Sequence, residues 1–348
     1  MTKAPRLLGS PMKKIAVAVL ATGLTAGLAG PAAAESDEVR FAQQFGLLYL
    51  PMHAVVSQKM VETCAKEKGL GDVKVSMHRF SGGAAVNQAL LSKNVDFAAG
   101  GIGPLLKIWD KTKGRLNVRA MTNLSAMPLK LNTNDGRVKS LENYVGLTDH
   151  KIATPSVKVS IQAVVLQMAA EKKWGKGNAF KLDDMTVSMK HPSAMAAMLA
   201  GGQSVKCHFA TLPTSWKELD SGKVHNVMTS YDVLGGRHST VAMYTAEAWK
   251  NDNPKLYECV WTSFRKAISW INEDKKRAAG LYHSFTKSKL ELGDVEKMLT
   301  TPGEMDYTLA PERTMQFAEF LHSIGSIDNM PASWKDYYWE NNHDQKGG

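Results

Sequence analysis

The sequence predicts an α/β protein made of two lobes, each with a mostly parallel sheet flanked by helices. Two observations support this prediction. Strand-like segments alternate with amphipathic helices, and the alternation restarts after a polar stretch in the middle of the chain. The chain has 348 residues, of which 44% are hydrophobic and 22% are charged. This composition is typical of a folded protein of about two domains and excludes a disordered chain.

The first half reads as a βαβαβ unit followed by one more strand. Strands are predicted at 39–45, 73–80, 96–102 and 116–124. A helix is predicted after Pro51, ending at Gly69, and a second one at 84–94. The first of these helices carries its apolar side chains at helical spacing, namely Met52, Val55, Val56, Met60 and Cys64. Strands separated by helices in this way form parallel sheets.

A polar stretch at 131–150 separates this unit from a second one. Here strands are predicted at 151–154, 185–190, 204–211 and 224–230, with a helix that begins near Ile161. Ser193 is expected to cap a short helix that ends at Gly201-Gly202. A further strand at 239–245 precedes a helical region and an aromatic tail at 333–339.

The restart of the pattern predicts two crossings between lobes, near 130–150 and near 231–239. Lobe one is then discontinuous, with residues 35–130 plus 240–348, and lobe two has residues 131–239. The two crossings form a hinge.

The first 34 residues have the pattern of a secretory signal peptide. Four basic residues and no acidic residue lie within 1–14, an apolar and small-residue run follows at 15–30, and Ala32-Ala33-Ala34 resembles a cleavage site. We therefore expect export and cleavage near Ala34-Glu35. A membrane anchor is the alternative, but the apolar run is shorter than the roughly 20 residues that a spanning helix needs.

The charge and the cysteines narrow the function further. The net charge of +10 falls to a mild positive balance once the basic start is removed, and without a basic-aromatic motif we expect no nucleic-acid partner. Cys64, Cys207 and Cys259 have no metal-ligand spacing, so we predict no metal site. One disulfide plus one thiol is one interpretation. Burial of free cysteines as small hydrophobic residues is the other, and the position of Cys64 on an apolar helix face favours it.

Several segments together resemble a known family. They are FAQQFGLLYLPMHAVVSQK at 41–59, the run from Phe80 to Pro104 with F-S-G-G and V-D-F-A-A-G-G-I-G-P, IATPSVKVS at 152–160, and the segment 190–216. In this order, after an export signal, they resemble the periplasmic solute-binding proteins of the nitrate/sulfonate/taurine class of ABC importers, which includes binders of pyrimidine precursors. The sequence departs from the family pattern at Lys93-Asn94, at Pro155-Ser156-Val157 and at Lys206.

The resemblance implies the two-lobed periplasmic-binding-protein-like fold of type II and a location in the periplasm. It implies a monomer, not an enzyme and without a cofactor, that captures a small solute by hinge closure. Its partners are the small-molecule ligand and an ABC permease with its ATPase at the inner membrane. Two alternatives remain: a ligand-sensing module for a membrane receptor, and an enzyme similar to the pyrimidine-synthesising proteins on the same fold. No nucleophile–base spacing supports the enzyme.

Candidate ligand-binding residues lie in the loops that follow the strands, because ligands of open α/β sheets bind beyond the carboxyl ends of the strands. Helix N-termini at these loops offer N–H groups that suit an anion. In lobe one the candidates are Gln44, Phe45, Leu48, Tyr49, Ser81, Gly82, Gly83, Gly101, Ile102 and Asn123. In lobe two they are Ser156, Lys158, Ser160, His191 and Thr211.

Each group of candidates has a structural alternative. Phe45 and Tyr49 also fit a core, the glycines also fit plain turns, Lys158 also fits an exposed position, and a lone histidine such as His191 has many structural roles. Because few cations are among the candidates, we expect a monoanion or an aromatic carboxylate-like solute.

Overall fold

The structure is a computed structural model that describes residues 1–2, 34–201 and 204–348. The signal-peptide prediction rests on residues 3–33, which lie outside the described residues, as does Gly202. Export and cleavage near Ala34-Glu35 therefore stay predictions. Within the described residues, no helix combines the length and the apolar character that crossing a membrane requires.

The first sheet has the strand order β2-β1-β3-β10-β4. β1 pairs in parallel with β2 and β3, whereas β10 runs antiparallel to both of its neighbours, so four of the five strands point the same way. The strands are β1 (Glu38–Gln43), β2 (Lys74–Arg79), β3 (Phe97–Gly101), β4 (Arg119–Ala126) and β10 (Ser239–Thr245).

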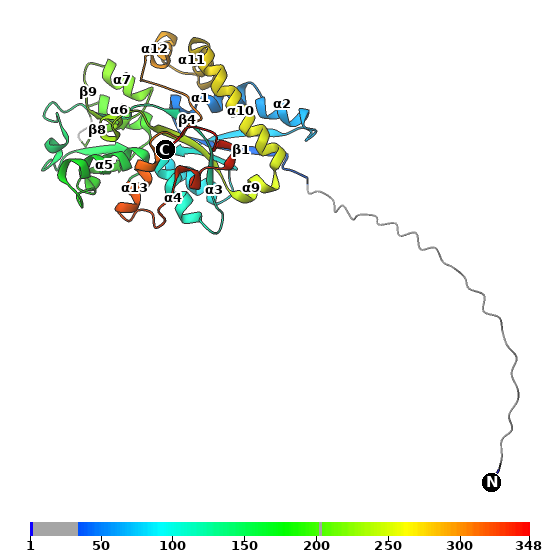
Figure 1. Cartoon of the computed structure of the whole chain (residues 1–348). Helices are drawn as coiled ribbons and strands as arrows, with labels where there is room; N and C mark the ends of the chain where they lie inside the picture. Colours follow the sequence, from blue (N-terminus) through cyan, green and yellow to red (C-terminus); the bar gives the residue numbers. More distant parts are fainter. Residues whose placement is uncertain (3–33, 202–203) are drawn as a thin grey trace. The chain divides into compact units, whose positions relative to one another are not determined.

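Helices cover both faces of this sheet. Alternate residues of each strand point to opposite faces, so that Phe41 packs in one cluster of buried residues and Ala42 in the other. One face is covered by α3 (Gly83–Leu91) and α4 (Ile102–Thr112), and the other by α1 (Leu50–Ser57), α2 (Met60–Glu67) and α10 (Pro254–Glu273). In Figure 1 this half of the molecule lies to the right, with α2, α9 (Glu247–Asp252) and α10 at its outer edge.

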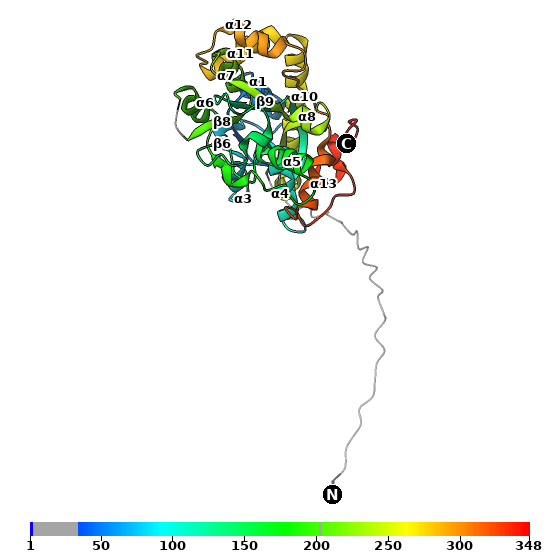
Figure 2. The same cartoon turned by 90° about the vertical axis from the view of Figure 1, so that its left-hand side faces the viewer.

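The second sheet repeats the arrangement with the order β7-β6-β8-β5-β9. Its one reversed strand is β5, which pairs antiparallel with β8 and β9. The strands are β5 (Lys130–Thr133), β6 (Lys151–Thr154), β7 (Thr186–Ser188), β8 (Val205–Ala210) and β9 (His225–Thr229). The helices of this half are α5 (Ile161–Trp174), α6 (His191–Leu199), α7 (Thr214–Asp220) and α8 (Ser230–Leu234). α5, α6 and α7 appear at the left of Figure 1, and α8 is labelled in Figure 2.

The chain passes between the sheets twice, and the two passages are hydrogen-bonded to each other. The Met127 N–H donates to Thr240 Oγ1 (3.0 Å) and the Leu129 N–H donates to Ser230 Oγ (2.9 Å). The backbone N–H of Ser230 returns a bond to the Leu129 carbonyl (2.9 Å). All of these residues are buried. The paired passages therefore form one narrow connection, which is the geometry a hinge needs.

The remaining helices extend from the first half of the fold. They are α9 (Glu247–Asp252), α11 (Lys275–Thr286), α12 (Leu292–Thr300) and α13 (Thr314–Ser323). α11 and α12 pack together and stand side by side in Figures 1 and 2. α13 contacts both α4 and α5, so the C-terminal part of the chain touches both halves. The lobe boundaries expected from the sequence, 35–130 plus 240–348 and 131–239, stay a prediction.

Three local expectations differ from the structure. The stretch 131–150 was expected to be a polar crossing, but it begins inside β5, where Asn132 is fully buried and donates to Glu218 (2.8 Å). The chain therefore changes sheet before Lys130. The long helix expected after Pro51 is interrupted at Lys59, whose φ of 50° ends α1 and starts α2. α6 begins at His191 because Pro192 fits its first turn, so Ser193 is not its cap.

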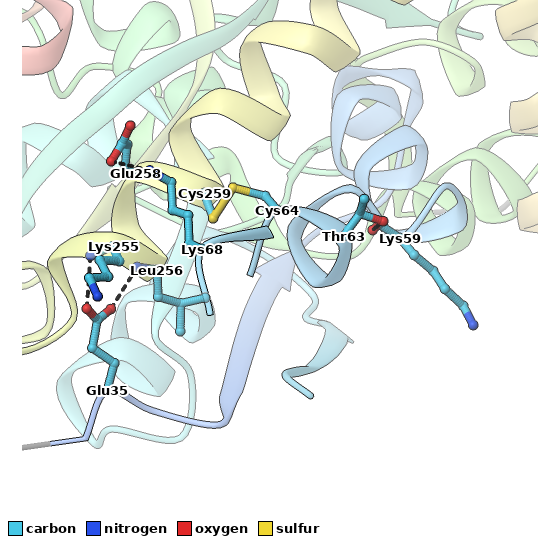
Figure 3. The surroundings of a disulfide bond; sticks show 9 residues. All are labelled: Glu35, Lys59, Thr63, Cys64, Lys68, Lys255, Leu256, Glu258 and Cys259. Carbon is cyan, nitrogen blue, oxygen red and sulfur yellow. Dashed lines mark hydrogen bonds and ion pairs between the residues drawn. A yellow bond between two sulfur atoms is a disulfide. The ribbon is translucent and has the colours of Figure 1, made fainter. Parts of the chain in front are cut away.

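A disulfide joins Cys64 of α2 to Cys259 of α10, and Cys207 is a buried free thiol. One bridge plus one thiol is thus the correct alternative, and the interpretation of Cys64 as a buried free cysteine is wrong. Figure 3 shows the polar contacts around the bridge, where Lys68 pairs with Glu258 (2.7 Å) and Glu35 accepts hydrogen bonds from the backbone of Lys255 and Leu256. Glu35 is therefore held against the start of α10.

Candidate ligand-binding cleft

A small cavity lies between the two halves, at the carboxyl ends of the central strands. The first half contributes the loop after β1, the starts of α3 and α4, and β10; the second half contributes the starts of α5 and α6. The lining residues are Gln44, Phe45, Leu48, Tyr49, Gly83, Gly101, Pro104, Ser160, Ile161, Gln162, His191, Thr240 and Val241. The free space at its centre is about 20 Å³, which is close to what one buried water molecule occupies.

The two halves touch closely around this cavity, and glycines make the contact feasible. A Cβ on Gly82 would collide with the carbonyl oxygen of Pro155 and with Ser156 Oγ. A Cβ on Gly101 would lie 2.8 Å from Ile161 Cβ. Neither glycine has the positive φ that excludes other residues. The requirement for glycine therefore comes from the second half of the molecule and not from the local backbone.

The loop after β1 forms the apolar wall of the cavity. Gly46, with φ 126°, turns the chain, and the Leu47 N–H donates to the Leu212 carbonyl (3.1 Å), which holds the loop against the start of α7. Leu48 and Tyr49 are buried, and burial raises the pKa of the Tyr49 hydroxyl far above its usual value. The hydroxyl is therefore neutral at any physiological pH.

Two cations, one from each half, stand at the outer edge of the cavity. Phe45 is half-buried, and its ring lies beneath both the guanidinium of Arg79, at 5.2 Å, and the ammonium of Lys190, at 5.9 Å. Arg79 ends β2 and Lys190 precedes α6. Both side chains are exposed. They create a positive rim without placing a charge inside, because none of the lining residues is a lysine or an arginine.

The second half contributes the polar side chains Ser160, Gln162 and His191 to the cavity wall, in addition to Gln44 and Thr240 of the first half. Ser160 accepts a hydrogen bond from the Ala163 N–H (3.2 Å) and so caps α5. The amide nitrogen of Gln162 lies 3.3 Å from Nε2 of His191, at the start of α6. Burial, followed by the proximity of His208, holds the pKa of His191 well below its usual range. The cavity therefore presents neutral hydrogen-bonding groups.

His191 is the outer end of a buried chain of polar groups. Its Nδ1 lies 2.7 Å from Nε2 of His208 on β8, and Nδ1 of His208 contacts Glu218 Oε1 on α7. Glu218 Oε2 accepts a hydrogen bond from Asn132 of β5 (2.8 Å). His208 and Glu218 are fully buried, and His191 is 6% exposed. Nothing in the sequence pattern links these four residues, which come from four different elements.

Solved structures with the same architecture were found by comparison. No family model and no curated protein matches the sequence. The alkanesulfonate-binding protein SsuA of Xanthomonas axonopodis pv. citri, bound to MOPS, superposes with a TM-score of 0.68 at 13% identity, covering 88% of this chain and 99% of that chain. The nitrate-binding protein NrtA of Synechocystis PCC 6803 has a TM-score of 0.67 at 14% identity, covering 89% and 88%.

The description of a third similar structure identifies the fold. It is a Candida albicans protein described as having the generic periplasmic binding protein fold, with a TM-score of 0.64 at 13% identity, covering 87% of this chain and 96% of that chain. The present chain has the periplasmic binding protein fold. The fold predicted from the sequence is thereby confirmed, and so is the resemblance to the sulfonate and nitrate class at the level of structure.

In this periplasmic binding protein fold, part of the candidate set lines the cavity and part does not. The candidates that line it are Gln44, Phe45, Leu48, Tyr49, Gly83, Gly101, Ser160 and His191. The candidates outside it are Ser81, Gly82, Ile102, Asn123, Ser156, Lys158 and Thr211. Their role in ligand binding stays a prediction, but the structure gives several of them other contacts.

Those contacts are structural. Ile102 is fully buried in the core, and Asn123 donates to the Thr308 carbonyl (3.1 Å). Ser156 accepts a hydrogen bond from the Ala84 N–H (3.3 Å), across the junction of the two halves. Lys158 is exposed, which agrees with the alternative to ligand binding that the sequence left open for it. Ile102 and Asn123 thus make contacts within the first half, and Ser156 makes a contact across the junction.

Five lining residues were not among the candidates: Pro104, Ile161, Gln162, Thr240 and Val241. Gln162 had a signal, since it lies in the first turn of a helix that follows a strand, where a ligand site was expected. Thr240 and Val241 had none. They reach the cavity because β10 inserts between β3 and β4, which the order of elements along the chain does not reveal.

Proposed function

We propose that this protein is the periplasmic substrate-binding component of an ABC importer, which captures a small anion between its two halves by hinge closure. The observation that supports it best is the cavity itself, because both halves contribute to its wall and the chain passes between them through two hydrogen-bonded crossings. Because the cavity is enclosed by both halves and its free volume is so small, a ligand can enter only when the halves separate. Release to a permease then follows from reopening.

The character of the ligand follows from the wall and its rim. The starts of α3, α4, α5 and α6 all converge on the cavity, and helix starts favour negative charge. Arg79 and Lys190 at the rim attract anions over a longer distance. The neutral interior suits a monoanion such as nitrate, bicarbonate or the sulfonate group of a small sulfonate. The sulfonate and nitrate binding of the structural neighbours is consistent with this class.

The test is a thermal-shift screen of the purified mature protein with nitrate, bicarbonate, taurine, methanesulfonate, aromatic acids and pyrimidines. A compound at 100 times its Kd should stabilise the protein by about 2.7 kcal/mol. Calorimetry on each hit should give one site per chain. If no anion shifts the melting temperature while the circular dichroism spectrum is that of a folded α/β protein, the proposed ligand class is wrong.

Transport is tested separately from binding. The loaded protein should stimulate the ATPase activity of a reconstituted cognate permease, and the protein without the anion should not. Binding without stimulation would favour the sensing module, and slow conversion of the bound compound would favour the enzyme.

A further inference from the structure

The buried chain Gln162–His191–His208–Glu218 leads from the cavity into the second half of the protein, and an ordinary anion site does not require it. Its members come from α5, α6, β8 and α7 in turn. Hydrogen-bond contacts join each to the next, and every member is at least nine-tenths buried. A carboxylate at the inner end can stabilise a positive charge on the histidine beside it, although no cation lines the cavity.

The hydrogen bonds along this chain can run in one of two directions. With both histidines neutral, His208 donates from Nδ1 to Glu218, His191 donates from Nδ1 to His208, and Nε2 of His191 accepts from the Gln162 amide. The end that faces the cavity is then an acceptor. An acceptor repels an anion, so this arrangement disfavours the ligand class proposed above.

One added proton reverses every bond except that to Glu218. The proton binds Nε2 of His191, the proton on Nδ1 of His191 moves to Nε2 of His208, and His208 becomes an imidazolium beside the Glu218 carboxylate. No other bond forms or breaks. His191 is again neutral, but its Nε2 now donates a hydrogen bond. The acceptor is either the anion or Oε1 of Gln162. In the second case the Gln162 amide rotates, so that its NH2 group turns toward the cavity. Within the described residues, the Gln162 side chain has no other hydrogen-bond partner that would oppose this rotation.

The charged residues near the buried chain are exposed or paired elsewhere. We therefore take the chain itself as the group whose protonation changes when an anion binds. On α7 the other charged residues, Lys217 and Asp220, are exposed. On β8, Lys206 pairs with Asp149 (2.9 Å) outside the cavity. β5 and β9 contribute the neutral Asn132 and Asn226. Arg79 and Lys190 lie at the rim beside Phe45, where they attract an anion toward the cavity.

We propose, on the basis of the function proposed above, that the cavity takes up its anion together with one proton, which the His191–His208–Glu218 chain stores away from the cavity. The protein therefore binds the anion most tightly at acidic pH. Above the titration point of the chain, affinity falls by up to about tenfold for each pH unit, because each bound anion then draws one proton from solvent.

The test uses nitrate and methanesulfonate, which stay ionised throughout the pH range of the experiment, so that any proton taken up belongs to the protein. Isothermal titration calorimetry is run from pH 5.5 to 8.5 in bis-Tris and in Tris. These amine buffers have different ionisation enthalpies and, unlike sulfonate buffers, do not compete for the cavity. The difference in observed enthalpy gives the number of protons taken up per anion. We expect a value approaching one, together with the pH slope in Kd.

Two variants locate the proton. Glu218→Gln removes the carboxylate that stabilises the imidazolium, so proton uptake should fall toward zero and binding at pH 6 should weaken about tenfold. His191→Gln keeps a hydrogen-bonding side chain at the wall but cannot carry the proton, so it should bind with a flat pH profile. The matched control is His225→Gln on β9, whose Nε2 bonds to the Val138 carbonyl away from the cavity. It should keep the wild-type slope.

The outcomes separate the two proposals. Binding of either anion without proton uptake by the wild-type protein, or a Glu218→Gln variant that retains the full pH slope, overturns the inference and leaves the proposed function intact. Failure of both anions to bind at every pH overturns the anion-binding function and the inference with it. If Glu218→Gln does not fold, the wild-type proton count and the ¹⁵N shifts of the His191 and His208 rings, which report the tautomers, still decide the matter.

Discussion

The two halves of the protein share a strand order but present different chemistry to the cavity between them. In each sheet the fourth strand, β10 or β5, is the reversed one, and it is the first strand after a crossing. From the first half the wall receives mainly aliphatic, aromatic and glycine surface, and from the second half Ser160, Gln162 and His191. The same architecture thus supplies shape on one side and hydrogen bonds on the other, because the fold constrains strand order but not the residues of the strand-end loops.

The halves also differ in how they are held together. The first half has a disulfide between α2 and α10, whereas the free thiol of Cys207 is buried in the second half, where Sγ donates to Thr133 Oγ1 (3.2 Å). The first half is therefore expected to be the more stable of the two under oxidising conditions.

The largest effect is expected from removing that disulfide. Cys64 and Cys259 are 195 residues apart, and closing so long a loop in the unfolded chain is worth about 3–5 kcal/mol. The Cys64→Ser/Cys259→Ser protein should lose that much free energy of unfolding in urea titrations, without a change in anion affinity at 25 °C. Reductant should destabilise the wild type to the same level and leave the double variant unaffected. A double variant as stable as the oxidised wild type would contradict the difference between the halves.

The next effect concerns the junction of the halves. Gly82→Ala adds a methyl group that collides with Pro155 and Ser156, although the φ of −170° at Gly82 suits alanine. The variant should favour the open arrangement and weaken nitrate binding about 10- to 100-fold by calorimetry. Gly280→Ala in α11, where a Cβ would meet nothing within 4 Å, is the matched control and should bind as the wild type does. Equal binding by both variants would mean that the halves need not meet at Gly82.

The contrast between the two walls can be measured directly. Gln162→Leu removes hydrogen-bonding groups from the polar wall at nearly constant volume, and it should weaken nitrate binding about tenfold, which corresponds to about 1.4 kcal/mol. Leu48→Met changes the apolar wall at nearly constant volume and should alter affinity by less than about twofold. Calorimetry at one pH compares the two. Similar losses in both variants would contradict the division of roles.

The smallest effect is expected at the rim, where both halves contribute alike. Arg79→Gln and Lys190→Gln should each slow nitrate association a few-fold at low ionic strength, because exposed charges act by long-range attraction. Stopped-flow measurements should show the rates of variants and wild type converging at high salt, with dissociation almost unchanged. A difference that persists in 1 M salt would mean that the cation contacts the bound anion.

Much of the fold follows from local sequence patterns, and the exceptions have physical reasons. The strands β1 to β4 and β10 were expected within a few residues of their observed bounds, because their apolar or alternating patterns are strong. β5 was missed because its sequence, KLNT, reads as polar; Asn132 is tolerated inside the sheet only because Glu218 and Asn226 bond to it. The break at Lys59 has no apolar signature, since the periodicity continues through it.

The residues of the cavity likewise include some that the sequence predicted and some that it did not. Gln44, Phe45, Ser160 and His191 were expected at the cavity because each follows a strand end, which is a local feature. The glycines were expected to admit a ligand, yet Gly82 contacts the opposite half. The positive rim was not expected, since Arg79 and Lys190 lie far apart in the sequence and meet only at Phe45.

The sequence alone determined which segments become strands and helices and which loops lie at the strand ends, because those properties depend on neighbouring residues and on the periods of two and 3.6. The tertiary structure decided which of these segments meet. It paired Cys64 with Cys259, inserted β10 beside β3, and aligned His191, His208 and Glu218. Such contacts depend on the order of strands in space and on the burial of both sheets, which no local pattern encodes.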